Sequence, residues 1–147
     1  MKTIIIYHSE HHGNTKKLAD AIADRYDAIL ISDRETDHIN LSDYDLIGFA
    51  SGIYYQKFHE NILKYAQDKL PHSKNVFFLY TCGIKRKSYT DAIRQIAESK
   101  CSRIAGEYGC LGFDTFGPFK LIGGIAKGRP DENDISGAIS FFDSILS

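Results

Sequence analysis

The sequence predicts an α/β protein whose parallel sheet is covered by helices on both faces. Short apolar runs alternate with amphipathic helical patterns along the chain. These runs are apolar on both faces, which is typical of strands buried between two helical layers. With 147 residues, 43% of them hydrophobic, the chain is long enough for one domain with a substantial core. We therefore expect residues 1–147 to form a single α/β domain.

The expected strands, in chain order, are residues 4–7, 28–31, 45–51, 75–80 and 103–111. Isoleucine, leucine, valine and aromatic residues dominate most of them, as expected of strands. The last is weakened by Gly106 and Gly109. Because helical patterns separate most of the runs, the strands are expected to lie parallel, joined by right-handed crossovers.

The expected helices, in chain order, are residues 14–26, 57–68, 88–100 and 134–146. In the second, Phe58 and Ile62 share one apolar face. Pro130-Asp131 is a start signal for the last helix. Residues 112–128, which precede it, form a long connection rich in glycine and aromatic residues, and connections of this length are often functional.

Three loops are expected to meet at the carboxyl edge of the sheet, where ligands of parallel sheets bind. They are residues 9–15, 51–58 and 81–88. The first joins a strand to a helix, so its backbone N–H groups and the helix dipole favour an anion such as phosphate. Ser9 and Thr15 offer hydroxyl groups, and Gly13 permits close approach of the backbone. The same loop would also serve as a plain helix cap, since Asn14 or Thr15 can cap a helix without any ligand.

The other two loops carry groups suited to a planar ring. Tyr54 and Tyr55 lie beside Gly52 and would form a wall for a conjugated ring, or would simply cover the sheet edge. Thr81-Cys82-Gly83 would hydrogen-bond the polar rim of that ring through its backbone. Cys82 is not expected to be a nucleophile, because no histidine–acid pair is placed to activate it.

Other kinds of site are disfavoured. His8, Glu10, His11 and His12 carry metal-ligand atoms, but a tight loop cannot easily turn all of them toward one ion, so no metal site is expected. The first loop matches neither the Gly-x-x-x-x-Gly-Lys-Ser/Thr pattern nor the Gly-x-Gly-x-x-Gly fingerprint. A phospho-acceptor receiver would need acidic residues where the chain has residues 7–9 and 50–51, so that class is excluded.

Charge and cysteine content narrow the setting. A net charge of −1 gives no strong field toward nucleic acid or a membrane surface. No stretch approaches membrane-spanning length, and the opening apolar run is too short for a signal peptide. Three widely spaced cysteines argue against a disulfide framework and favour a reducing cytoplasm. Cys101 and Cys110 are expected to be buried packing residues.

Several segments resemble the flavodoxin family. Three are similar to its flavin loops: Tyr7-His8-Ser9 through His12-Gly13-Asn14-Thr15, Ser51-Gly52-Ile53-Tyr54-Tyr55, and Thr81-Cys82-Gly83. The stretch from Gly112 to Pro130 is similar to the tail of a bacterial short-chain branch. The resemblance covers essentially the whole chain, and the first loop is its most specific motif. It departs at His11 and His12, where many members have threonine or other hydroxyl residues.

The resemblance implies a flavodoxin-like three-layer αβα sandwich with a five-stranded parallel sheet in the order 2-1-3-4-5. It also implies a non-covalently bound flavin mononucleotide (FMN). The residues that would surround its phosphate are Ser9, His11, His12, Gly13, Asn14 and Thr15. Tyr54, alone or with Tyr55, would stack on or flank the isoalloxazine ring, within the loop that begins Ser51-Gly52-Ile53. Thr81, Cys82 and Gly83 would line the pyrimidine side of that ring.

The function that the resemblance implies is a cytoplasmic carrier of single electrons between redox partner proteins, a reductase and an electron acceptor. The cofactor would supply the chemistry, without a catalytic acid or base. We expect a monomer that binds neither nucleic acid nor a membrane. Two alternatives stay open: an FMN-dependent NAD(P)H:quinone-type oxidoreductase of the same fold, and a flavin-free domain that makes protein contacts.

Two further hypotheses concern the edge of the ring. Electron-carrying flavodoxins are markedly acidic and this chain is nearly neutral, so Lys85-Arg86-Lys87 is expected to ease formation of the reduced, anionic flavin. Phe113, Phe116 and Phe119 are expected to anchor the long connection to the core, although they could also cap the ring.

Overall fold

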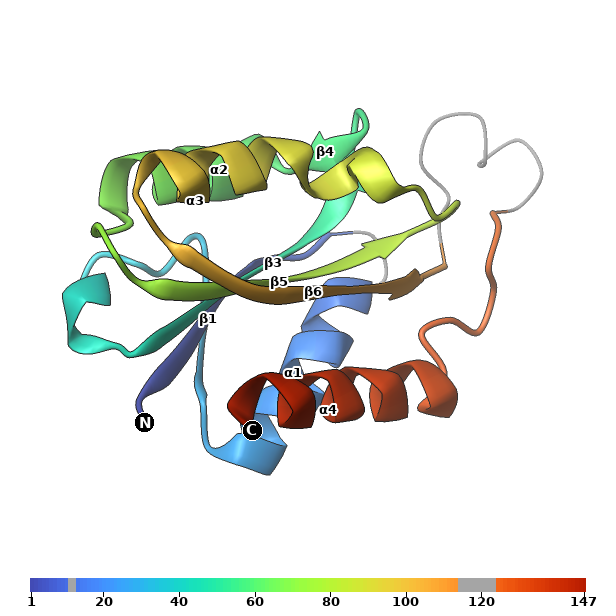
Figure 1. The fold of residues 1–147 in the computed structure, drawn as a ribbon. Helices are drawn as coiled ribbons and strands as arrows, with labels where there is room; N and C mark the ends of the chain where they lie inside the picture. Colours follow the sequence, from blue (N-terminus) through green and yellow to red (C-terminus); the bar gives the residue numbers. More distant parts are fainter. Residues whose placement is uncertain (11–12, 114–123) are drawn as a thin grey trace.

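A sheet lies between two helical layers in the computed structural model, which describes residues 1–10, 13–113 and 124–147 (Figure 1). The strands are β1 (Thr3–His8), β2 (Ile29–Ser32), β3 (Leu46–Tyr54), β4 (Lys57–Phe58), β5 (Asn75–Cys82) and β6 (Arg103–Leu111). The helices are α1 (Asn14–Tyr26), α2 (Glu60–Lys69), α3 (Asp91–Ser99) and α4 (Glu132–Leu146), with short 3-10 turns η1 (Leu41–Asp43) and η2 (Lys87–Thr90). The predicted three-layer α/β architecture is confirmed.

The strand order of the sheet is β2-β1-β3-β5-β6, and β4 pairs only with β3. Every neighbouring pair along this path is parallel. Without β4 this is the order 2-1-3-4-5, so that prediction is confirmed. The strand order reverses between β1 and β3, whose carboxyl ends carry the first two predicted loops, and ligands of open parallel sheets bind at such a point.

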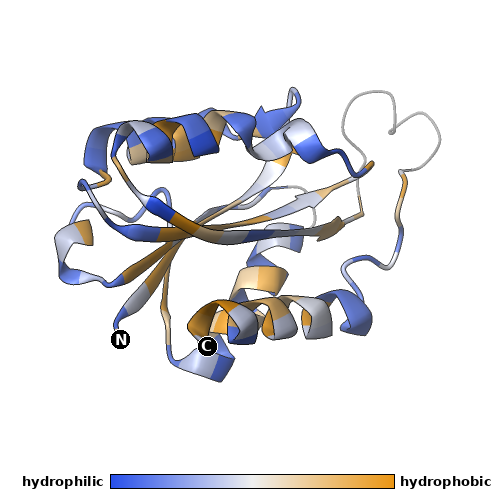
Figure 2. Cartoon of the chain, viewed as in Figure 1, coloured by the Kyte–Doolittle hydropathy of each residue, from blue (hydrophilic) through white to orange (hydrophobic). Residues whose placement is uncertain are grey.

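Two apolar clusters fill the two faces of the sheet. Helices α1 and α4 cover one face, and α2 and α3 cover the other (Figure 1). Ile4 and Ile6 of β1 belong to the cluster under α2 and α3, whereas Ile5 belongs to the cluster under α1 and α4, because successive side chains of a strand point to opposite faces. Figure 2 shows hydrophobic colouring along the central strands and hydrophilic colouring on many of the outer helical turns.

One expected element is wrong. The helix predicted over residues 57–68 begins at Glu60, and the two residues before His59, Lys57 and Phe58, form β4 instead. β3 continues past its expected end to Tyr54 because its last residues pair with β4 in a hairpin. Phe58 is nevertheless fully buried. The apolar position was therefore identified correctly, but a strand pairing decides its conformation.

Smaller differences occur elsewhere. β5 continues to Cys82, β2 is shifted by one residue from the expected run, and the helix expected over residues 88–100 divides into η2 and α3. The start signal of α4 is confirmed, with Asp131 as its N-cap.

All three cysteines are free, and Cys110 is buried as expected. Cys101 is exposed, contrary to expectation, because it lies in the turn between α3 and β6 with a φ of 56°.

No helix among the described residues has the length and apolar character needed to cross a membrane.

The start of α4 is held by a network of charged side chains. Arg129 binds the Asp134 carboxylate through two N–H groups, with Nε–Oδ2 at 2.5 Å and Nη2–Oδ1 at 2.6 Å. Asp131 and Asp134 complete a capping box, each accepting a hydrogen bond from the other's backbone N–H. The hydrogen bond from Arg129 is the main reason that the pKa of Asp134 is lowered.

The substitution Asp134→Asn is expected to lower the free energy of unfolding by about 1–3 kcal/mol at pH 7, because it removes a charge-assisted pair and weakens the cap. The lowered pKa of Asp134 means that its contribution is complete above its ordinary pKa, about 4, and is lost as the pH falls through the folded-state pKa. Urea unfolding at a series of pH values should therefore show the difference from wild type narrowing below about pH 4. Asp37→Asn, at an exposed position, is the control; a difference for Asp134→Asn that is constant from pH 7 to pH 3 would contradict the assignment.

Candidate ligand site at the carboxyl edge of the sheet

A cavity lies at the carboxyl edge of the sheet, where the loops after β1, β3 and β5 meet the segment after β6. Its lining residues are Glu10, Asn14, Thr15, Gly52, Ile53, Tyr54, Thr81, Cys82, Gly112 and Phe113. The structure thus brings the three predicted loops together, as their positions in the sequence indicated. Whether each residue contacts a ligand stays a prediction.

The helix behind the first loop has an open N-terminus. Gly13 is the N-cap of α1 with a φ of 66°, and it has no side chain to cap the helix. A Cβ atom at Gly13 would meet nothing within 4 Å among the described residues. The first turn contains no acidic residue, and Lys16 donates its backbone N–H to Ser9 Oγ at 3.3 Å. Backbone N–H groups at a positive helix end favour an anion, and here Ser9 Oγ accepts, among those of the described residues, only that of Lys16.

Asn14 joins this helix end to the segment after β6. Its Nδ2 donates to the Phe113 carbonyl at 2.7 Å, which also fixes the orientation of the amide. The Oδ1 atom is buried and accepts no hydrogen bond from the described residues. An unpaired buried acceptor costs about 1–3 kcal/mol, so this atom calls for a donor that the described chain does not supply, such as a ligand hydroxyl. Gly112 leaves room for the Asn14 side chain, because a Cβ there would lie 2.7 Å from Nδ2.

Hydroxyl groups tie the loops together beneath the cavity. Thr15 Oγ1 and Thr81 Oγ1 lie 2.8 Å apart and are hydrogen-bonded, which links the first loop to the third. Ser51 is fully buried; its hydroxyl donates to the Gly52 carbonyl at 2.6 Å and accepts the His59 backbone N–H at 3.0 Å. The structure therefore places Ser51 under the cavity, where it holds the β3–β4 hairpin against the start of α2.

The two tyrosines of the second loop lie in different settings. Tyr54 is half-buried and its ring lies over Gly52, since a Cβ on that glycine would be 3.3 Å from Tyr54 Cε2. Tyr55 and Gln56 form the two-residue turn of the hairpin, with φ values of 52° and 71°. Two positive φ angles indicate a type I′ turn, a conformation that is strained for a tyrosine. Tyr55 is 82% exposed, so Tyr54 is the tyrosine that lines the cavity.

The described residues enclose only about 40 Å³. That volume holds a few water molecules, and it is well below the roughly 300–1,000 Å³ of sites for small organic ligands. This volume refers to the described lining alone, and Tyr54, packed over Gly52, forms part of its wall.

The third loop closes the site with neutral groups. Cys82 Sγ donates to the Cys110 carbonyl at 3.6 Å, and the Gly112 backbone N–H donates to the Cys82 carbonyl at 2.9 Å. Burial raises the pKa of Cys110 to about 12, so its thiol stays protonated. Gly83 is half-buried next to the cavity, and residues 84–88 beyond it are exposed.

Some predicted residues lie outside the described part of the chain, namely His11, His12, Phe116 and Phe119. The sequence reasoning missed Glu10 and Gly112 as lining residues and assigned Phe113 mainly to anchoring. The glycine-rich, aromatic segment that begins at Gly112 was the signal for two of them, since long connections often carry function. Glu10 had no such signal, because a carboxylate beside an anion site is unfavourable; Arg34 Nη2, at 3.5 Å from Glu10 Oε1, offsets part of its charge.

Comparisons with known proteins agree with this geometry. Residues 4–112 match the family model of a flavodoxin domain. The chain is 39% identical to an uncharacterised protein of Methanocaldococcus jannaschii over 99% of both chains. Among solved structures it is similar to a flavodoxin from the domain Archaea, with 17% identity, a TM-score of 0.69 and 100% of both chains covered.

Two other structures extend the comparison. One is a flavoprotein from Lactobacillus acidophilus in complex with FMN, with 19% identity and a TM-score of 0.57 over 74% of this chain and 92% of that one. The other is a WrbA-like flavodoxin protein from Agrobacterium tumefaciens, with 16% identity and a TM-score of 0.66 over 99% and 95% of the two chains. At these identities the likeness shows the fold alone. The strand order, the loops that meet at its reversal and the family match together show that the chain belongs to the flavodoxin family.

Proposed function

We propose that this protein binds FMN non-covalently and carries single electrons between redox proteins. The observation that carries the proposal is the N-terminus of α1, whose N-cap Gly13 has no capping side chain, with the buried Asn14 Oδ1, which accepts no hydrogen bond from the described residues, beside it. A ribityl phosphate offers the anion that the helix end attracts and the hydroxyl that Asn14 Oδ1 lacks. Likeness to a flavoprotein in complex with FMN supports the same ligand.

In this proposal the protein binds and tunes the cofactor, and FMN supplies the one-electron chemistry. Backbone N–H groups of the first loop, His11 and His12 included, hold the phosphate together with the Ser9 and Thr15 hydroxyls. Tyr54 would stack on the ring, and Thr81, Cys82 and Gly83 would line its pyrimidine side. No residue that lines the cavity is required to act as an acid or a base.

The second candidate function is an FMN-dependent NAD(P)H:quinone-type oxidoreductase. One observation favours it: the segment after β6 lines the cavity through Gly112 and Phe113, so residues beyond the three predicted loops also contribute to the site. The chain is also similar to a WrbA-like protein. We prefer the carrier because it requires only a flavin site, whereas the enzyme would also require a second pocket over the flavin for the nicotinamide and the quinone.

Two measurements on the purified protein separate these functions. The visible spectrum should show bound flavin in both, and a protein that neither retains FMN nor takes it up would contradict both. Steady NAD(P)H oxidation with a quinone, without any other protein, would establish the enzyme. Electron uptake only through an added reductase would establish the carrier.

The proposed setting is the cytoplasm, where the three free cysteines would stay reduced. The proposed partners are a reductase and an electron acceptor, met by the monomer at the carboxyl edge. Exposed residues 84–87 lie at this edge, where η2 packs near β4. They combine Ile84 with the cations of Lys85-Arg86-Lys87.

Replacing Lys85, Arg86 and Lys87 by glutamine is expected to lower the midpoint potential of the second one-electron couple, because their charges favour the anionic reduced flavin. The matched control replaces Lys69, Lys100 and Arg103 by glutamine. These substitutions remove the same amount of charge at the opposite edge of the sheet, where α2 and α3 end and β6 begins. Redox titration at low salt should show a larger drop for the first triple variant. An equal drop in both, or a rise in the first, would count against the hypothesis.

A further inference from the structure

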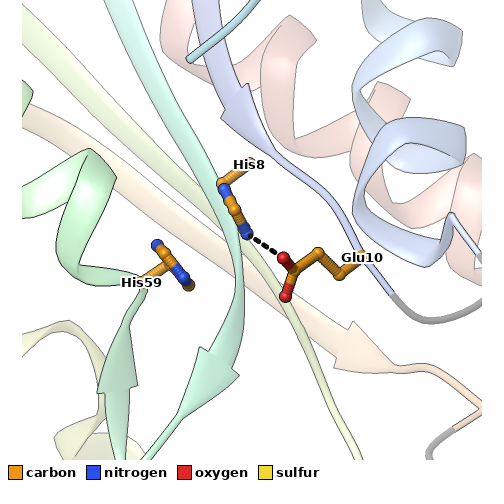
Figure 3. A group of neighbouring side chains, drawn as sticks. All are labelled: His8, Glu10 and His59. Atoms are coloured by element: carbon orange, nitrogen blue, oxygen red, sulfur yellow. Dashed lines mark ion pairs between the residues drawn. The ribbon is translucent and has the colours of Figure 1, made fainter. Parts of the chain in front are cut away.

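Three metal-ligating side chains lie together beside the cavity, and only two of them, His8 and Glu10, are near each other in the sequence. His8 ends β1, Glu10 lies in the loop after it, and His59 precedes α2 (Figure 3). One ligand atom of each lies within 4.8 Å of the other two. The proposed flavin role uses neither histidine, so the cluster requires its own explanation.

His8 is already held in the orientation of a metal ligand. Its Nδ1 lies 2.6 Å from Asp33 Oδ2, and both side chains are almost completely buried. A carboxylate that accepts the Nδ1–H leaves the Nε2 lone pair free and fixes its direction, as in many metal sites. Nε2 is buried and makes no hydrogen bond to any described residue. A buried lone pair without a donor is unfavourable, and a bound cation is one group that would satisfy it.

Glu10 faces that lone pair at a distance suited to a shared ion. Glu10 Oε1 lies 3.5 Å from His8 Nε2, beyond an ordinary hydrogen bond. Two ligand atoms of a tetrahedral ion with bonds of about 2.1 Å are separated by about 3.4 Å. The Glu10 side chain is 38% exposed, which gives an ion access from solvent. Arg34, the other cation near Glu10 in the described chain, is 69% exposed and only weakly bound.

His59 supplies the third ligand after a change of ring angle. Its ring stacks on that of His8, with centroids 3.7 Å apart and planes 11° apart. Parallel rings direct their lone pairs alongside each other, so His59 has to tilt to share an ion with His8. It also has to release the Asn61 backbone N–H, which its Nδ1 accepts at 3.1 Å.

We propose that His8, Glu10 and His59 bind one divalent transition-metal ion of the zinc class, with Asp33 as the residue that positions His8. Two imidazole nitrogens and one carboxylate oxygen suit Zn²⁺, Co²⁺ or Ni²⁺, and water completes the coordination. The ion would also neutralise Glu10 at the rim of the candidate flavin cavity. The proposal does not depend on flavin binding, because none of its three ligands needs the cofactor.

The test uses Co²⁺, whose visible absorption reports coordination, with the chelator-treated full-length protein. Wild type is expected to bind one Co²⁺ with the spectrum of a four-coordinate site, and Zn²⁺ should displace it. His59→Asn removes the imidazole but keeps a residue that caps helices well, so the fold should survive. It should weaken Co²⁺ binding more than tenfold, and Asp33→Asn should weaken it about 10–100-fold. Circular dichroism and urea unfolding establish that each variant is folded.

The control is the double variant His11→Ala/His12→Ala, which removes the neighbouring histidines of the first loop. It is expected to keep Co²⁺ affinity within about threefold of wild type. Wild-type protein without a four-coordinate Co²⁺ spectrum would overturn the proposal. Undiminished binding by His59→Asn would also overturn it and show an adventitious surface ion only. A loss in the double variant as large as that in His59→Asn would assign the ion to the loop histidines and overturn it too.

Discussion

The substitution Gly48→Ala is expected to lower the free energy of unfolding by about 3 kcal/mol, because the centre of the sheet has no space for a methyl group. A Cβ atom at Gly48 would lie 2.3 Å from Phe77 Cζ and under 3 Å from two more atoms of the ring. Phe77 is fully buried, and its ring packs against Phe142 at 5.4 Å between centroids. Gly48 lies between β1 and β5 and is paired with both strands. Its backbone is therefore held in place and cannot shift to relieve the clash.

Urea unfolding measures this effect, and a second variant tests its cause. In Gly48→Ala/Phe77→Leu the smaller side chain removes the clash, so the double variant should be more stable than the sum of the two single effects by about 1 kcal/mol or more. Strict additivity would show that the methyl group does not meet the ring. A Gly48→Ala protein within about 0.5 kcal/mol of wild type would contradict the packing described here.

The substitution Tyr54→Ala is expected to weaken FMN binding about 10–100-fold, because it removes ring stacking and the apolar area buried with it. Tyr54→Phe should stay within about threefold of wild type, since the hydroxyl is not needed for stacking. Tyr55→Ala should have the smaller effect of the two alanine variants, because Tyr55 lies 82% exposed in the hairpin turn. Fluorescence titration of the flavin-free protein with FMN gives the three dissociation constants. A larger loss of FMN affinity for Tyr55→Ala than for Tyr54→Ala would contradict the assignment of ring stacking to Tyr54.

The parts that the sequence predicted well are those governed by local pattern. The first strand, its loop and α1 follow each other within one short stretch, and Gly13, Asn14 and Thr15 mark the helix start directly. Alternating strands and helices then imply a parallel sheet, and the place where the strand order reverses implies the ligand edge. Seven of the predicted site residues line the cavity, namely Asn14, Thr15, Gly52, Ile53, Tyr54, Thr81 and Cys82, and their contact with a ligand stays a prediction.

The parts that it could not predict depend on contacts between distant residues. Phe58 and Ile62 have helical spacing, but the pairing of Ile53 with Phe58 draws residue 58 into a strand. Tertiary contacts override a local pattern of this kind. Asp33 and His59 are far from His8 in the sequence. No short sequence motif therefore indicates that His8 Nδ1 is hydrogen-bonded to Asp33 or that its ring stacks on that of His59.

The central claim is that a phosphate-bearing flavin binds at the start of α1. Paired calorimetric titrations of the flavin-free protein with FMN and with riboflavin test it most directly. The two ligands differ only in the phosphate. FMN is expected to saturate one site, and riboflavin to bind at least about 100-fold more weakly, because charge-assisted hydrogen bonds to the helix N-terminus are worth about 1.5–3 kcal/mol each. Equal affinity for the two ligands, or no heat with FMN, would contradict the claim.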